Sequence, residues 1–497
     1  MRSILAAAAT AVLFSLLSTV VAQDGTGNIP ASYNGTSPYV CDPKVCIFPT
    51  CVCASLNPPN GMVASTVPQF VTITFDDDVG PELIATAYKV LAAATNPNGC
   101  PVRGTWFVSI QWTEFDLVQE WYSAGNEVAD HTWSHVGIPP AIEIESCKAS
   151  LNTYAGIPRG KIQGFRAPFL NYSAGTFQEI GQQGFLYDSS TTGVIDDANW
   201  PYTLDYGLAN DCWSGICAPG TIKQPGVWEI PMQAIVDNTG IPQLMDVYLA
   251  GTVANVTDWY NTNWARHYNG QRAPFGIYVH PTHLTNYVGL PDETANLNGL
   301  LAIIKNIAAQ PDVWFVTNQQ LLQWMKNPVP ASEMAAQPYM TCQQPVINRT
   351  ICNGLDDTGK GINYPNLTLS CGIGNTYFDT CFNCPGTEPT VDNPIPAAAL
   401  QPGQTALRSL LPDTCDTPWW DPIGNVCLCN SSTCAYKDLS QPIVLTNTSS
   451  NGTSTNGSST GTPTGSSTNK SGAAHMVLNS IGMLIIAVLS AGIMVTV

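Results

Sequence analysis

Residues 71–78 read Val71-Thr72-Ile73-Thr74-Phe75-Asp76-Asp77-Asp78. The first five side chains are β-branched or aromatic, which predicts a buried strand that ends in three consecutive carboxylates. Neighbouring carboxylates repel one another and are costly to remove from water. A solvated turn would tolerate this run, but a bound cation would also explain it.

A second motif favours the cation. Residues 131–135 read His131-Thr132-Trp133-Ser134-His135, which places two imidazoles four residues apart. Two imidazoles and one carboxylate form a three-ligand set that is typical of a catalytic metal site. The sequence therefore predicts a divalent metal, with Zn²⁺ as the expected ion and Co²⁺ as the alternative.

Length and composition restrict the class of protein. The chain has 497 residues, which is enough for two or three domains, and its net charge is −18. This acidity argues against binding to nucleic acid. Only 11% of the residues are charged, which suits an extracellular protein that carries sugars.

The N-terminus predicts secretion. Arg2 precedes an apolar run from Ile4 to Val21, and a small-residue cleavage site follows it, so we interpret residues 1–22 as a signal peptide. Ten sequons for N-glycosylation indicate a glycoprotein. They lie at Asn34, Asn171, Asn255, Asn348, Asn366, Asn430, Asn447, Asn451, Asn456 and Asn469.

The 17 cysteines of a secreted chain predict disulfides. Eight lie between Cys41 and Cys217, and nine lie between Cys342 and Cys434. The first eight can pair among themselves, so we expect the odd thiol among the C-terminal nine. Zinc binding by clustered cysteines is the less favoured alternative, because the secretory route oxidises thiols.

The C-terminus indicates a membrane anchor. Residues 438–472 are rich in Ser and Thr and predict a glycosylated stalk. Small residues at 471–474 precede an apolar tail, Met476 to Val497, with no basic residues after it. We interpret residues 473–497 as the signal for a glycosylphosphatidylinositol anchor, which is removed. A single-pass membrane helix is the alternative, although the missing basic residues argue against it.

Between the termini, the pattern predicts a Cys-containing lead-in at 23–65, a catalytic domain at 66–327 and a Cys-rich accessory region at 341–437. Within 66–327, short apolar runs alternate with helical stretches, which favours a parallel α/β fold, a distorted barrel of seven to eight strands. The expected strands are 70–75, 105–108, 127–129, 162–165, 184–187, 227–230, 276–279 and 313–316. The expected helices are 81–94, 113–124, 292–307 and 317–325.

Four of these strands end directly in reactive residues. Asp76 and Asp77 follow the first, His131 follows the third, Arg166 follows the fourth and His280 follows the seventh. In α/β barrels the chemistry lies at the C-terminal ends of the strands. The sequence therefore predicts that these side chains meet in one site.

The motifs at these strand ends resemble those of a known family, the polysaccharide deacetylases. These carbohydrate esterases remove N-acetyl groups from chitin and related polymers. The resemblance covers roughly residues 40–327, and the cysteine cluster and residues 200–205 are similar to the chitin deacetylase-like branch. The motifs are Thr74-Phe75-Asp76-Asp77, His131-Thr132-Trp133-Ser134-His135, Arg166-Ala167-Pro168-Phe169-Leu170 and Tyr278-Val279-His280.

The resemblance implies a role for each carboxylate and imidazole of the first two motifs. Asp77, His131 and His135 would hold the metal, and Asp76 would be the general base that takes a proton from the attacking water. Asp76 and Asp77 are neighbours on an extended segment, so we expect their side chains to diverge.

The remaining motifs imply the rest of the machinery. Arg166 would pair with Asp76, and the backbone N–H of Phe169 would stabilise the oxyanion. His280 would protonate the leaving amine, and His283, three residues later, is the alternative acid.

The sequence departs from the family pattern in three motifs. In the Arg motif, Ala167 and Phe169 stand where Pro and Tyr are common, and Phe169 keeps its backbone N–H. Asp78 stands where the first motif often ends in Gly, and this third carboxylate either alters the metal's surroundings or faces solvent. The fourth motif is blurred, and Trp200 and Asp205 are the candidates for its pocket-lining aromatic residue and its His-orienting acid.

Together these features predict a metal-dependent chitin deacetylase that yields chitosan and acetate. We expect it outside the cell, at the outer face of the plasma membrane through its lipid anchor or in the cell wall, in contact with cell-wall glycans. One alternative is a catalytically weak glycan-binding protein, which the intact Asp77, His131 and His135 disfavour. Another is a deacetylase of acetylxylan or peptidoglycan.

Overall fold

The computed structural model describes residues 38–285, 293–342, 368–380 and 382–400, residue 402, and four short strands between residues 356 and 428. Those strands are β14 (Asp356–Asp357), β15 (Ile362–Asn363), β18 (Trp419–Asp421) and β19 (Val426–Leu428). The predicted signal peptide, stalk and anchor signal lie outside the described residues. So do all the sequons except Asn171, which is half-buried, and Asn255, which is exposed.

A nine-stranded sheet forms the centre of the fold, and all its pairings are parallel except that of β7 with β8. The order is β12 (Phe275–Val279), β1 (Gln69–Asp77), β2 (Thr105–Val108), β3 (Glu127–Asp130), β4 (Gly164–Phe165), β5 (Tyr187–Asp188), β8 (Gln224–Glu229) and β7 (Tyr202–Leu204), while β13 (Val313–Phe315) also pairs with β1. Among the described residues no pairing joins β12 to β7 or β8, so the barrel is incomplete. The distorted α/β barrel expected from the sequence is thus confirmed.

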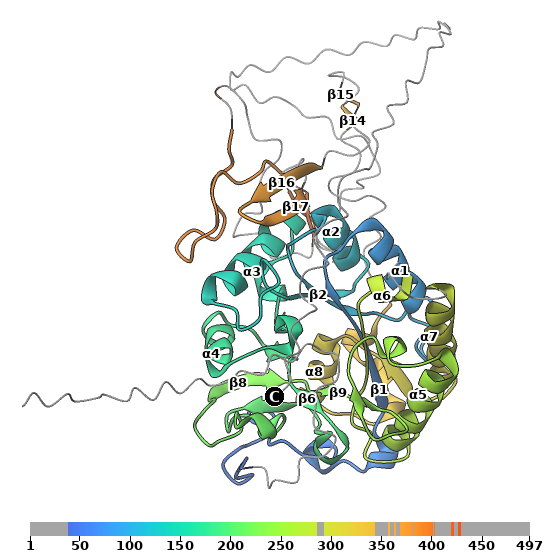
Figure 1. The fold of residues 1–497 in the computed structure, drawn as a ribbon. Helices are drawn as coiled ribbons and strands as arrows, with labels where there is room; N and C mark the ends of the chain where they lie inside the picture. The colour runs from blue at the N-terminus through green and yellow to red at the C-terminus, as the bar shows by residue number, and fades with distance from the viewer. Residues whose placement is uncertain are drawn as a thin grey trace, which may run out of the picture. The chain divides into compact units, whose positions relative to one another are not determined.

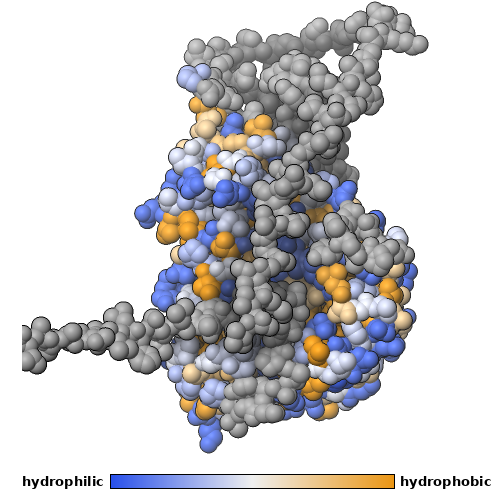
Figure 2. All heavy atoms as spheres, viewed as in Figure 1, coloured by the Kyte–Doolittle hydropathy of each residue, from blue (hydrophilic) through white to orange (hydrophobic). Residues whose placement is uncertain are grey.

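Helices cover this sheet (Figure 1). They are α1 (Pro81–Leu91), α2 (Phe115–Ser123), α3 (Ala141–Ala155), α4 (Ala174–Gln182), α5 (Val253–Tyr268), α6 (Thr282–Thr285), α7 (Glu293–Ala308) and α8 (Asn318–Lys326). Among the described residues, no helix has the length and apolar character to cross a bilayer. The face in Figure 2 carries small, separate hydrophobic groups among hydrophilic ones, as on the surface of most globular proteins.

Strand β1 is the central element of the sheet. Its side chains from Gln69 to Asp76 are all buried, which explains why the strand reads as a continuous run of apolar and β-branched residues. Val71, Ile73 and Phe75 enter the main hydrophobic cluster, while Phe70 joins a second cluster around Trp324. One strand therefore holds two parts of the core together.

Short paired segments lie outside the main sheet. Four of them, β6 (Thr192–Gly193) with β9 (Met232–Gln233) and β10 (Ile235–Val236) with β11 (Pro242–Gln243), precede α5. A hairpin of β16 (Leu369–Ile373) and β17 (Thr376–Thr380) lies against the loop after β2. There the Trp112 N–H donates to the Tyr377 carbonyl at 2.6 Å, and the Asp379 N–H donates to the Thr113 carbonyl at 2.9 Å.

The cysteine pairing differs from the sequence-based expectation. Cys100 bonds to Cys342, across 242 residues, rather than to another of the first eight cysteines. The free thiol among the described residues is Cys147, which is buried on α3 and donates to the Val108 carbonyl. The prediction was wrong because spacing alone does not fix connectivity. The other described pairs are Cys41–Cys53, Cys46–Cys51, Cys212–Cys217 and Cys371–Cys384.

Loss of the long-range disulfide should lower stability more than loss of a short-range one. A crosslink restricts the unfolded chain more when it closes a longer loop, by about 5 kcal/mol for the Cys100–Cys342 loop and about 2 kcal/mol for the Cys212–Cys217 loop in the chain-entropy treatment. Denaturant unfolding of the two double Cys→Ser variants would measure the difference. Equal losses for the two variants would contradict this account.

Candidate active site

The C-terminal ends of β1, β3, β4 and β12 open onto one pocket of about 270 Å³. Its lining contains Asp76, Asp77, His131, His135, Ala167, Phe169, Leu170, Met245, His280, Thr282 and His283. The parallel pairing of β1 with β2 and β12, and of β2 with β3, brings these strand ends to the same edge of the sheet. The residues that the sequence placed at strand ends therefore do meet.

A buried ion pair lies at the floor of the pocket. Arg166 is fully buried, and its Nη1 donates to Asp76 Oδ1 at 2.6 Å and to the Thr74 hydroxyl at 2.9 Å. Its Nε donates to the Ser189 carbonyl at 2.8 Å, and the guanidinium lies 4.0 Å from the centre of the Phe107 ring. A buried charge needs this degree of pairing and hydrogen bonding. The second carboxylate oxygen of Asp76, Oδ2, faces His131 Nε2 at 3.8 Å.

Asp77 and two imidazoles form a cluster beside this pair. Asp77 Oδ1 lies 3.0 Å from His135 Nε2 and 3.6 Å from His131 Nε2. The Nδ1 of His131 lies 2.8 Å from the carbonyl oxygen of Arg166, which can only accept a hydrogen bond. Nδ1 therefore carries the proton, and the lone pair of Nε2 points toward Asp77.

The backbone departs from ordinary conformations at this cluster. Asp77 has φ +78°, His135 has φ +56° and Phe169 has φ +57°, all in the left-handed region that non-glycine residues rarely occupy. Such strain concentrates at functional sites. It also explains why Asp76 and Asp77 both line the pocket. The expectation that their side chains diverge was wrong, because Asp77 is not in extended backbone.

His280 is held by an acid that sequence reasoning missed. Asp246 accepts hydrogen bonds from the backbone N–H of His280 at 2.8 Å and from its Nδ1 at 2.5 Å. His283 Nδ1 lies 2.6 Å from the same carboxylate. Of these two imidazoles, His280 reaches the first cluster, since its Nε2 lies 3.5 Å from Asp77 Oδ2. Asp246 follows no predicted strand. Its backbone is in the left-handed conformation, with φ +52°, and no sequence motif marks this position.

The groups of the pocket shift one another's pKa. Burial lowers the pKa of His131 to about 4, so its imidazole is neutral at neutral pH. Burial would also lower the pKa of His280, but the carboxylates of Asp246 and Asp77 outweigh it and raise that pKa to about 10. Burial opposes ionisation of Asp77 and Asp246 too, yet the nearby imidazoles hold both pKa values below their usual range. The site thus combines ionised carboxylates, a neutral His131 and a protonated His280.

Three residues singled out in the sequence lie elsewhere. Trp200 is buried, stacks on Trp324 at 5.6 Å and does not line the pocket. Asp205 accepts from the Gly226 N–H at 3.3 Å, so the acid that orients His280 is Asp246 instead. Asp78 does not line the pocket either, and burial and the charge of Asp77 raise its pKa to about 6. Phe169 lines the pocket with its ring 4.5 Å from that of His135.

The residues present fit a divalent metal. Asp77 Oδ1 is buried and accepts no hydrogen bond from the described residues, although it faces two imidazole nitrogens. A carboxylate and two imidazoles with one side open to the pocket match a catalytic zinc site. The carbonyl that orients His131 is the kind of outer partner that such ligands have. Asp246, His280 and His283 form a second set of three close ligand atoms.

Comparisons with known proteins identify relatives of this chain. The sequence model of the family described as polysaccharide deacetylase matches residues 64–187. Chitin deacetylase 8 of Bombyx mori is 32% identical over 374 residues, which cover 71% of this chain and 93% of that relative. Chitin deacetylase 1 of Bombyx mori is 30% identical over 320 residues, which cover 59% of this chain and 58% of that relative.

Solved structures show a weaker similarity. The chitin deacetylase from the fungal pathogen Colletotrichum lindemuthianum is 14% identical, with a TM-score of 0.29 over 52% of this chain and 88% of that one. A polysaccharide deacetylase from Mycobacterium smegmatis is 16% identical, with a TM-score of 0.35 over 55% of this chain and 95% of that one. Similarity at this level supports no functional conclusion.

Metal binding should depend on the first cluster and not on the second. We expect elemental analysis of the purified protein to find one divalent metal per chain. The His131→Ala His135→Ala variant should lose it, because only Asp77 would remain as a ligand. A His283→Ala variant should keep the metal, since His283 belongs to the Asp246 cluster. Stoichiometric metal in the double variant would contradict the assignment.

Proposed function

Because this chain belongs to the polysaccharide deacetylase family and is thus a hydrolase, we propose that it removes N-acetyl groups from chitin or chito-oligosaccharides. The products are chitosan and acetate. The observation that carries the proposal is the Asp77–His131–His135 set directly beside the Asp76–Arg166 ion pair. Amide hydrolysis needs an activated water, a base and a proton donor, and this pocket offers side chains for all three.

We propose Asp77, His131 and His135 as the residues that hold the metal, with Zn²⁺ expected. When bound there, the metal supplies Lewis-acid activation of the water and of the acetyl carbonyl. His131 is already in the tautomer that this requires, with its Nε2 lone pair directed at the cluster. Among the described residues, Asp77 Oδ1 accepts no hydrogen bond that would compete.

Asp76 is the proposed general base. Its Oδ1 is occupied by Arg166 at 2.6 Å, whereas Oδ2 faces the pocket near His131. A water molecule in the pocket could therefore pass its proton to Oδ2 as it attacks the carbonyl. Arg166 fixes the carboxylate and compensates its charge through a charge-assisted hydrogen bond.

His280 is the proposed general acid. Asp246 holds Nδ1, so Nε2 is the nitrogen that presents a proton to the pocket. The leaving amine needs this proton, because an unprotonated amide nitrogen is a poor leaving group. The backbone N–H of Phe169 is proposed to donate to the oxyanion, as Phe169 lines the same pocket.

We propose that the protein acts outside the cell, on cell-wall glycans. Disulfides such as Cys100–Cys342 suit an oxidising compartment. We further propose a lipid anchor attached near residues 469–473, because the small residues Ser471 to Ala474 precede an apolar tail. Phosphatidylinositol-specific phospholipase should then release the protein from membranes. Membrane attachment that persists in cells unable to make such anchors would contradict this.

Substitution of Asp76 should separate catalysis from metal binding. Asp76→Asn cannot accept the proton of the water, so kcat for acetate release from chito-oligosaccharides should fall at least ~10²-fold while the metal content stays at one. A chelator should abolish activity of the unsubstituted protein, and added Zn²⁺ should restore it. Near-normal kcat in metal-loaded Asp76→Asn would place the base elsewhere. A parallel assay on acetylxylan and peptidoglycan would test the choice of polymer.

The pH profile should report the contact between Asp246 and His280. The pKa of His280 is raised, so its active, protonated form persists to high pH, and activity is lost as pH rises through that pKa. Asp246→Asn removes the carboxylate and should move the alkaline limb of kcat/KM to lower pH. Asp205→Asn is the matched control and should leave this limb in place, because Asp205 contacts Gly226 instead. An unchanged limb in Asp246→Asn would refute the role of His280 as acid.

A further inference from the structure

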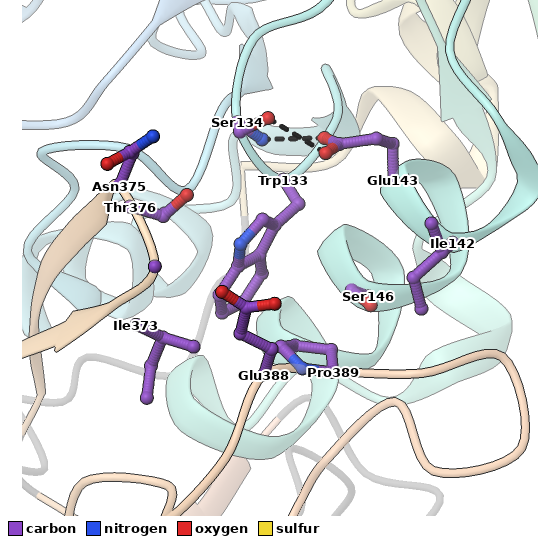
Figure 3. Close-up of a pocket in the computed structure, with 11 residues that line it drawn as sticks. Trp133, Ser134, Ile142, Glu143, Ser146, Ile373, Asn375, Thr376, Glu388 and Pro389 are labelled. Carbon is purple, nitrogen blue, oxygen red and sulfur yellow. Dashed lines mark hydrogen bonds between the residues drawn. The ribbon is translucent and has the colours of Figure 1, made fainter.

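A second cavity of about 270 Å³ lies on the other side of the His131–His135 segment. Trp133 and Ser134 line this cavity, whereas His131 and His135 line the catalytic pocket. Helix α3 contributes Glu143 and Ser146, the β16–β17 hairpin contributes Asn375 and Thr376, and Glu388 comes from the segment after the hairpin. Figure 3 shows Trp133 between the hairpin residues and those of α3.

The hairpin is held firmly enough to form a defined wall. The Asp379 N–H donates to the Thr113 carbonyl, and the Tyr377 N–H donates to the Gln111 side chain at 2.9 Å. Phe378 is buried in the main hydrophobic cluster and packs edge-on against Trp133 at 5.6 Å. The cavity is therefore built from two distant parts of the chain that are packed and hydrogen-bonded together.

The charge of the cavity favours a cation. Its lining contains two carboxylates, Glu143 and Glu388, and none of its residues is Lys, Arg or His. Both oxygens of Glu143 already accept from Ser134, one from its N–H at 2.7 Å and one from its hydroxyl at 2.8 Å. Glu388 is exposed and accepts no hydrogen bond among the described residues, and in Figure 3 its carboxylate points from the backbone toward Trp133.

The uncharged lining suits a sugar ring. The Ser146 hydroxyl is buried and has no hydrogen-bond partner among the described residues, which marks an unused polar group in the wall. Asn375 and Thr376 add an amide and a hydroxyl. Trp133 is largely buried, and the part of its indole that lines the cavity can contact C–H groups or an ammonium group. The volume lies just below the usual range for ligand pockets, about 300–1,000 Å³, which suits a single ring.

We propose that this cavity binds a glucosamine unit, with its protonated primary amine on Glu388 and its ring against Trp133. The assignment rests on the proposed function, because deacetylation converts the neutral acetamide of the substrate unit into a primary amine while the rest of the sugar stays the same. The cavity therefore selects the product unit over the substrate unit. A partly deacetylated chain would be retained beside the catalytic pocket through the residues that the enzyme has already processed.

Binding of a fully deacetylated glucosamine tetramer to the full-length chain tests this directly, by titration calorimetry. All measurements use an Asp77→Ala background, so that the N-acetylated tetramer can be compared without turnover. Glu388→Gln keeps the shape of the side chain but removes its charge, and should weaken binding of the glucosamine tetramer about tenfold, as for loss of one charge-assisted hydrogen bond. The N-acetylated tetramer should be insensitive to this substitution.

Glu333→Gln is the matched control, since Glu333 is an exposed glutamate that does not line the cavity. The chain carries a net charge of −18 and attracts any polycation, but that general attraction would fall equally in both variants. Equal affinities of the Glu388→Gln and Glu333→Gln variants for the glucosamine tetramer would overturn the proposal. The proposal would also be overturned if Glu388→Gln lowered the affinity for both tetramers equally, because that would indicate a site for neutral sugars.

The result of this binding experiment can be distinguished from the result that tests the proposed deacetylase activity. If the unsubstituted enzyme releases no acetate from any glycan while Glu388-dependent binding of the glucosamine tetramer persists, the catalytic proposal fails and the binding site stands. If acetate is released but the two glutamate variants bind alike, the site fails and the catalytic proposal stands.

Discussion

The parallel pairing of β1 with β12 on one edge and with β13 and β2 on the other is the constraint on which the structure depends. Because β1 is buried along its length, a shift in its register would expose its core residues and move Asp76 and Asp77 away from the neighbouring strand ends. The same pairing places Phe75 opposite Val279, so His280 follows at the level of Asp76. The packing of the core and the geometry of the pocket are thus set by one set of backbone hydrogen bonds.

Charge compensation explains how several carboxylates can share this pocket. Each acid has a cationic or hydrogen-bonding counterpart, Arg166 for Asp76 and His280 for Asp246, while Asp77 lies among three imidazoles. Removal of one partner would leave a buried charge uncompensated, which costs several kcal/mol. The arrangement also divides labour between the acids. Asp76 is fixed by the buried guanidinium of Arg166, whereas Asp77 keeps a buried oxygen close to two imidazole nitrogens.

The sequence was informative where a single local signal determines the outcome. The buried run before Asp76 and the His131–His135 pair identified the central strand and most of the pocket, because strand ends and ligand spacing are local properties. Helix α3 was missed because its buried side includes polar residues such as Ser146, Lys148 and Ser150, which obscure the apolar period. Asp246 and the Cys100–Cys342 pair were missed because both contacts join residues far apart in the chain. The fold around Trp133 likewise depends on a hairpin more than two hundred residues away, which no local pattern reveals.

The central claim is that Asp77, His131 and His135 form the metal site of a deacetylase. Anomalous diffraction from crystals grown with Zn²⁺ tests it most directly, because His280 and His283 of a second candidate cluster line the same pocket. The account predicts a single strong peak about 2.0–2.2 Å from a carboxylate oxygen of Asp77 and from the Nε2 atoms of His131 and His135. A peak held instead by Asp246, His280 and His283 would contradict it, since His280 could not then serve as the proton donor.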